Sequence, residues 1–132
     1  MKDMRSRFGF HSTPFSREIQ IKDCFVLEPF EVARRALLST IDQRESAALI
    51  APAGTGKSVV LRAVEAGLPE ARYRTHYVKV TSLSKRDMCR EISMAVGSEP
   101  AGSFPVLVRK LQQRFLQIME TDGVRPVLLL DE

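Results

Sequence analysis

The sequence has no tryptophan and only two cysteines, two histidines and two tyrosines among its 132 residues. Cys24 and Cys89 lie far apart, without histidines at metal-ligand spacing, which predicts buried free thiols and no zinc site. No apolar run approaches the roughly 20 residues that a membrane helix needs, and the basic N-terminus lacks the apolar core of a signal peptide. We therefore expect a cytoplasmic protein without a membrane segment.

The sequence also lacks a large excess of either charge. Its 20 basic and 16 acidic residues leave a net charge of only +4. A charge this mild permits contact with nucleic acid without demonstrating it. The small basic clusters are more typical of solvated faces than of a phosphate-binding track. His76 lies in an alternating apolar and polar run, where we expect its side chain on the exposed face.

The most informative segment is residues 51–58, which read Ala-Pro-Ala-Gly-Thr-Gly-Lys-Ser between two apolar runs. A strand at 47–50, a glycine-rich turn and a helix starting at Lys57 would form a phosphate cradle. Loop N–H groups and the helix dipole would face the anion. Lys57 would add a full charge, and Ser58 would offer its hydroxyl to Mg²⁺. These patterns predict nucleoside triphosphate binding by Ala53, Gly54, Thr55, Gly56, Lys57, Ser58 and Val59.

One position departs from the usual pattern, since Ala51 stands where the loop normally opens with glycine. A positive φ at this residue would cost about 1–2 kcal/mol, whereas an extended conformation would cost little. The alternative interpretation of the whole segment is an ordinary glycine-containing turn between a strand and a helix.

The second informative segment is at residues 127–132, where the apolar run 127–130 is followed by the two acids Asp131 and Glu132. The run is short and without alternation, which predicts a buried parallel strand. Ligands of open α/β sheets lie beyond the carboxyl ends of strands. Asp131 would then hold the Mg²⁺ that Ser58 also contacts, and Glu132 would orient or deprotonate the attacking water. The alternative is a pair of solvated charges.

Between these signals the sequence predicts a continuous α/β alternation without internal repeats. Expected elements are a helix over 30–43, a helix from Lys57 to about Ala66 ended by Gly67, a strand over 73–81, a helix from the Ser84 capping box to about 96 with Gly97 as its stop, and an amphipathic helix after Ser103. Strands separated by helices imply a parallel sheet. Residues 1–28 are expected to be irregular, with apolar anchors at Phe8, Phe10, Phe15 and Phe25, and residues 29–132 form the α/β domain.

With these motifs in place, the chain resembles the ExeA-type AAA+ P-loop ATPases, relatives of the TniB and IstB transposition helpers. The resemblance is carried by Phe8-Gly9-Phe10, Thr13-Pro14-Phe15, the loop Ala51–Ser58, the run His76–Asp87 and the acidic strand end Leu128–Glu132. It implies an ASCE-type fold in which Lys57, of the Walker A motif, contacts the β- and γ-phosphates and is catalytic together with Glu132. Ser58 and Asp131, the latter from the Walker B motif, would serve Mg²⁺. It also implies a homo-oligomer that hydrolyses ATP in transposition or a secretion-related process, with DNA and a transposase as partners.

The resemblance also implies elements without a counterpart here: a sensor strand between the loop strand and the acidic strand, a further strand, an arginine finger and a helical lid. We therefore expect a truncated AAA+ domain with a gap in its sheet, weak nucleotide binding and little or no turnover. A non-hydrolysing nucleotide-binding module and an inactive gene fragment are the alternatives.

Overall fold

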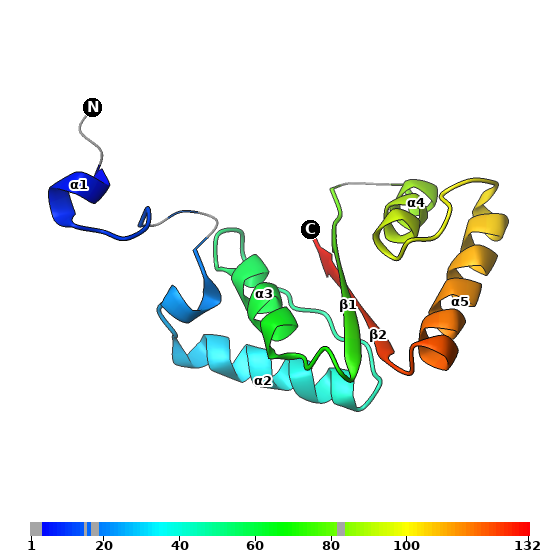
Figure 1. The fold of residues 1–132 in the computed structure, drawn as a ribbon, viewed down its shortest axis with the longest axis horizontal. Coiled ribbons are helices and arrows are strands. Elements are labelled where there is room, and N and C mark those ends of the chain that lie inside the picture. Colours follow the sequence, from blue (N-terminus) through cyan, green and yellow to red (C-terminus); the bar gives the residue numbers. More distant parts are fainter. Residues whose placement is uncertain (1–3, 15, 17–18, 82–83) are drawn as a thin grey trace.

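Figure 1 shows two parallel strands standing between two pairs of helices. The structure is a computed structural model that describes residues 4–14, 16, 19–81 and 84–132. Within these ranges the elements are α1 Met4–Phe8, a 3₁₀ turn η1 Ile21–Asp23, α2 Glu28–Asp42, α3 Lys57–Gly67, β1 Tyr73–Lys79, α4 Lys85–Ala95, α5 Phe104–Thr121 and β2 Arg125–Asp131. None of these helices is long and apolar enough to cross a membrane.

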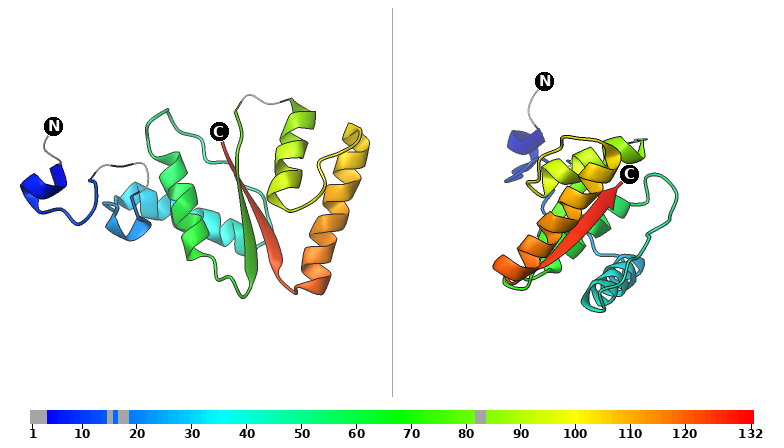
Figure 2. Two further views of the ribbon diagram at one scale, coloured as in Figure 1. Left: turned by 45° about the horizontal axis from the view of Figure 1, so that its top comes forward. Right: turned by 90° about the vertical axis from the view of Figure 1, so that its right-hand side faces the viewer.

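The register of the two strands decides which side chains share a face. β1 pairs with β2 from Tyr73 opposite Arg125 to Lys79 opposite Asp131. Because successive side chains point to opposite faces, Tyr73, Tyr77 and Leu129 lie on the face covered by α3, whereas Val78 and Leu128 lie on the face covered by α4 and α5. Figure 2 shows the same arrangement from a second direction, with α2 and α3 on one side of the strands and α4 and α5 on the other. The predicted parallel α/β arrangement is confirmed.

Each face of the sheet has its own apolar core. The first combines Val64 and Leu68 of the α3 region with Tyr73 and Leu129. The second joins the strands to α4 and α5 through Val78, Ile92, Val96 and Leu111. The apolar stripe predicted for α5 faces this second layer, where Leu107 and Ile118 are fully buried, although its two ends, Phe104 and Met119, remain exposed.

The helices end where local chemistry stops them. Ser84 accepts a hydrogen bond from the backbone N–H of Asp87 at 3.1 Å, which confirms the predicted cap of α4, and Gly97 follows that helix with a φ of +70°. α3 ends at Gly67, as predicted, but Gly67 is its last helical residue and does not have the positive φ of Gly97. Leu68 is the extended C-cap, since the following Pro69 favours an extended residue before it.

The strand predicted at residues 47–50 is absent, which corrects the sequence analysis. This segment is irregular, and Ile50 is 91% exposed. A strand needs a neighbour to bind its N–H and C=O groups, and here the facing edge belongs to β2 across a cavity of about 1040 Å³. We call this cavity the central groove; residues 44–51 line one wall and residues 125–132 the other.

The N-terminal aromatic anchors do not behave as expected. α1 stands apart from the helices and strands of the α/β unit (Figure 1). Phe8 and Phe10 are 60% and 44% exposed and pack on each other, with ring centroids 5.8 Å apart, while Phe25 is 85% exposed. Phe15 lies outside the described residues. Five residues of helix provide too little apolar surface to dock by themselves.

Candidate functional site

The glycines of the loop adopt the conformation that the phosphate-cradle pattern predicts. Gly54 and Gly56 have φ values of +77° and +88°, in the left-handed region that glycine adopts without steric cost. Ala51 is not among the described residues with positive φ, which removes the expected penalty for alanine at this position. Gly56 is also the N-cap of α3, so the turn leads directly into the helix N-terminus. There the first backbone N–H groups have no helical acceptors and suit an anion.

Phe30 of α2 supports this turn, a contact that the sequence analysis did not anticipate. A Cβ added to Gly56 would lie 2.4 Å from the Cζ atom of the Phe30 ring. Phe30 lies in the helix that the sequence predicts over 30–43, but helical spacing says nothing about which loop that helix contacts.

Lys57 folds back over the loop. Its Nζ donates to the carbonyl of Ala51 at 2.9 Å and to that of Pro52 at 3.0 Å. Thr55 Oγ1 donates to the same Pro52 carbonyl at 2.7 Å. The ammonium group therefore binds two neutral carbonyl oxygens of the loop, and a negatively charged phosphate oxygen would be a stronger acceptor for it.

Ser58 and Asp131 meet although they are 73 positions apart in sequence. Ser58 Oγ donates to Asp131 Oδ1 at 3.0 Å. The strand register explains the approach, since Asp131 lies on the face of β2 that α3 covers, and Ser58 is in the first turn of α3. A hydroxyl and a carboxylate at this separation are hard oxygen donors of the kind Mg²⁺ prefers. The two residues predicted to share a metal are thus brought together.

Tyr77 completes the surroundings of Asp131. Its hydroxyl donates to Oδ2, the carboxylate oxygen that Ser58 does not bind. Burial, and next the bond to Asp131, raise the pKa of Tyr77 above its ordinary range, which further favours the protonated hydroxyl that donates this bond. Tyr77 was not predicted from the sequence as a site residue, although the alternating run around His76 was a signal that the neighbouring Tyr77 side chain lies on the opposite face of the strand.

Glu132 lies just beyond β2 and is exposed. It lines the central groove together with Lys57 and Asp131. Asp131 and Glu132 lie at the carboxyl end of β2, where α/β folds hold their ligands, and Lys57 lines the same groove.

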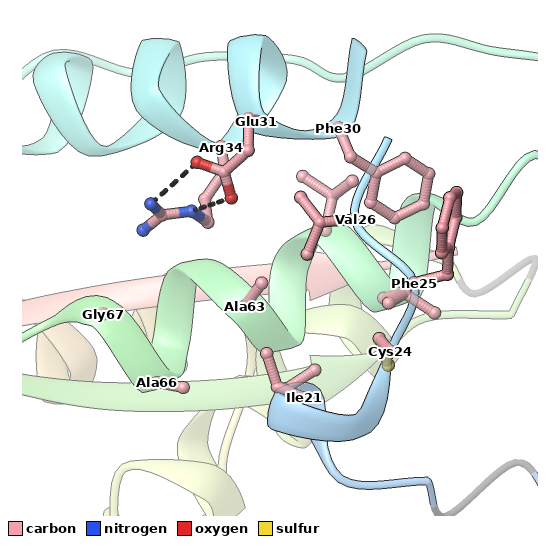
Figure 3. A pocket seen from close by; sticks show the side chains of 12 residues that line it. Ile21, Cys24, Phe25, Val26, Phe30, Glu31, Arg34, Ala63, Ala66 and Gly67 are labelled. Carbon is pink, nitrogen blue, oxygen red and sulfur yellow. Dashed lines mark hydrogen bonds and ion pairs between the residues drawn. The ribbon is translucent and has the colours of Figure 1, made fainter. Parts of the chain in front are cut away.

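A second, smaller cavity of about 290 Å³ lies on the far side of α3, between η1, α2 and the helix itself. Figure 3 shows its side chains, with Phe25, Val26 and Phe30 at one end and Ala66 and Gly67 at the other. The Arg34 guanidinium donates to both carboxylate oxygens of Glu31, at 3.1 and 3.0 Å, and this bond lowers the pKa of Glu31. The ion pair leaves the remainder of the cavity apolar.

Comparison with known proteins identifies the family. Residues 40–132, more than half of the chain, match the family model of the AAA domain. The chain belongs to the AAA domain family. This family consists of nucleotide-binding ATPases that generally bind ATP with Mg²⁺, and the parallel strands with flanking helices fit a P-loop NTPase-like fold. No curated protein matches the chain, and no solved structure does.

Proposed function

We propose that this AAA domain binds Mg²⁺·ATP in the turn formed by residues 53–59, with the phosphates at the N-terminus of α3. The observation that supports it best is the bond between Ser58 and Asp131, because it unites two groups that a magnesium-bound triphosphate needs and that the sequence holds 73 positions apart. The positive φ of Gly54 and Gly56 supports the cradle as well, since it turns successive N–H groups to one side.

Each side chain then has a defined task. Lys57 exchanges the carbonyls of Ala51 and Pro52 for phosphate oxygens, gaining charge-assisted bonds. Ser58 and Asp131 hold Mg²⁺, which when bound supplies charge neutralisation on the phosphates. Glu132 accepts a proton from, or orients, the attacking water. Its exposure and its place in the lining of the central groove, next to Asp131 in sequence, support that assignment.

The test is ATP affinity measured by isothermal titration calorimetry with and without Mg²⁺. Lys57→Ala should weaken binding at least about 10-fold, since bonds to charged groups are worth roughly 1.5–3 kcal/mol. Lys85→Ala is the matched control, because Lys85 is also the first residue of a helix and is exposed; its affinity should equal the wild type. A wild-type protein that binds no ATP, or a Lys57→Ala variant that binds it normally, contradicts the proposal.

Phosphate release separates hydrolysis from binding alone. If Glu132 is the base, Glu132→Gln should abolish release while ATP affinity persists. Binding without release in the wild type would instead favour the non-hydrolysing nucleotide-binding module.

We further propose a cellular role as a helper ATPase in DNA transposition or in a secretion-related process, assembling as a homo-oligomer in the cytoplasm with DNA and a transposase as partners. It is supported by the resemblance to ExeA-type ATPases at the loop, the His76–Asp87 run and the acidic strand end. If the protein binds DNA through its phosphate backbone, the affinity for DNA should fall steeply as the salt concentration rises. Affinity for duplex DNA that is absent at all salt concentrations, with and without ATP, would argue against the transposition role.

A further inference from the structure

Asp131 is held at both of its carboxylate oxygens by residues from two different elements. Ser58 of α3 binds Oδ1 at 3.0 Å, and Tyr77 of β1 binds Oδ2. A carboxylate near the end of a strand can otherwise rotate about two side-chain torsions. Two donors from two directions leave it one orientation.

The position of Tyr77 follows from the sheet and not from chance contact. Tyr77 pairs with Leu129, so Asp131 lies two residues further along β2 on the same face. Diagonal neighbours of this kind lie within reach of an aromatic side chain. The Tyr77 ring packs against the buried cluster that includes Val64 and Leu129. This packing holds the ring in place, so its hydroxyl reaches Asp131 from a fixed position.

We propose that Tyr77 is a positioning residue for the divalent cation of the Mg²⁺·ATP complex, because its hydroxyl turns Asp131 so that Oδ1 faces Ser58. The inference rests on the proposed function, and extends it to a residue outside the loop and the acidic strand end. Tyr77 itself contacts neither the cation nor the nucleotide. It acts through the carboxylate, as the outer partners of metal ligands do.

Tyr77→Phe tests this, since it keeps the ring in its cluster and removes only the hydroxyl. Loss of an outer partner typically costs about 10-fold or more in metal affinity, so we expect ATP affinity in the presence of Mg²⁺ to fall by about that factor. ATP affinity in excess EDTA should stay at the wild-type value. The ratio of the two affinities is the readout, because a general loss of stability would lower both.

Tyr73→Phe is the matched control. Tyr73 is on the same strand, and its hydroxyl also donates to an aspartate, Asp42, at 3.0 Å, away from the loop. This variant should keep the wild-type ratio. In the double variant Tyr77→Phe/Asp131→Asn the ratio should equal that of Asp131→Asn alone, because the proposed positioning is exerted through the Asp131 carboxylate.

The outcomes separate the two proposals. If the wild type binds Mg²⁺·ATP and Tyr77→Phe has the same ratio, the positioning role is overturned and the proposed function stands. Equal losses with Mg²⁺ and with EDTA also overturn it, because they point to damage of the loop. A wild-type protein that binds no ATP overturns the proposed function and this inference together.

Discussion

Single residues of the loop differ in what constrains them. Gly54 and Gly56 both have a positive φ, but nothing lies within 4 Å of a Cβ built on Gly54, while the Phe30 ring blocks a Cβ on Gly56. Gly54 is therefore required by backbone conformation alone. Gly56 is required by conformation and by the close approach of α2.

Alanine substitutions should separate these two constraints. Gly54→Ala should lower the free energy of unfolding by about 1–2 kcal/mol, the cost of a left-handed non-glycine residue. Gly56→Ala should cost more, because Phe30 must also move, and it should displace the loop. Chemical denaturation and ATP titration of both variants check this. Equal destabilisation by the two would show that the Phe30 contact imposes nothing.

At the scale of elements, α2 and α4 end with the same hydrogen bonds but different residues. After α2, the N–H of Glu45 bonds the Thr40 carbonyl and that of Arg44 bonds the Ile41 carbonyl, both at 3.0 Å. This is a Schellman motif, and its left-handed residue is Arg44, with a φ of +62°. After α4 the corresponding residue is Gly97.

Arg44→Gly should therefore stabilise the protein, by about 1 kcal/mol, because glycine removes the left-handed strain. Gly97→Ala is the opposite substitution at the matching position, and should destabilise by a similar amount. Urea denaturation midpoints measure both. A destabilised Arg44→Gly variant would mean that the Arg44 side chain contributes more than its backbone costs.

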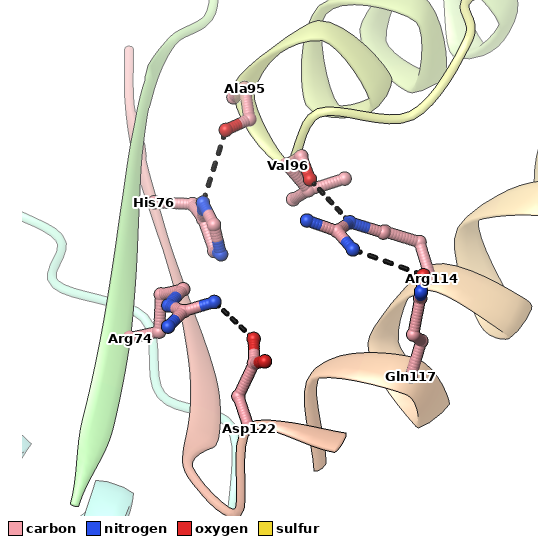
Figure 4. A network of polar contacts seen from close by, with 7 residues as sticks. All are labelled: Arg74, His76, Ala95, Val96, Arg114, Gln117 and Asp122. Atoms are coloured by element: carbon pink, nitrogen blue, oxygen red, sulfur yellow. Dashed lines mark hydrogen bonds and ion pairs between the residues drawn. The ribbon is translucent and has the colours of Figure 1, made fainter. Parts of the chain in front are cut away.

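At the scale of the whole molecule, the layer formed by α4 and α5 partly covers His76, which the sequence analysis placed on the exposed face. That expectation is wrong, because the even-numbered side chains of β1 face these helices. Figure 4 shows the result: His76 Nδ1 lies 3.1 Å from the Ala95 carbonyl, with Arg74 and Arg114 nearby. Among the described residues, its buried Nε2 has no hydrogen-bond partner. Arg74 pairs with Asp122, and Arg114 donates to the Val96 carbonyl at 2.8 Å.

This environment predicts a pH dependence of stability. Burial is the main cause that lowers the pKa of His76 below its ordinary 6.5. The bond to the Ala95 carbonyl raises this pKa, whereas the positive charges of Arg74 and Arg114 lower it further. The unfolded chain then takes up a proton at this residue before the folded chain does. Stability should be complete above about pH 6.5 and should fall as pH decreases through the lowered pKa.

Thermal melts between pH 7.5 and 5 measure this loss. His76→Gln should flatten the profile in that range, while His11→Gln, at an exposed position, should leave it unchanged. A profile that keeps its slope in His76→Gln would assign the pH dependence to other groups.

The sequence by itself determined the local features of this protein. The glycine positions of the loop, the Ser84 cap, the Gly97 stop and the helices and strands from Lys57 onward follow from backbone sterics and hydrogen bonding over a few residues. The AAA domain family accords with the loop and acidic strand end identified there. Residue spacing was also enough to nominate Ser58 and Asp131 as a pair.

Only the tertiary structure decided what depends on neighbours distant in sequence. Residues 47–50 have apolar composition typical of a strand, yet form none, because pairing requires an adjacent edge and the central groove lies there instead. Tyr77 reaches Asp131, Phe30 covers Gly56 and α4 partly covers His76 because strand register and helix packing bring these groups together. Periodicity fixes which side chains share a face, whereas the packing of the layers fixes what that face meets.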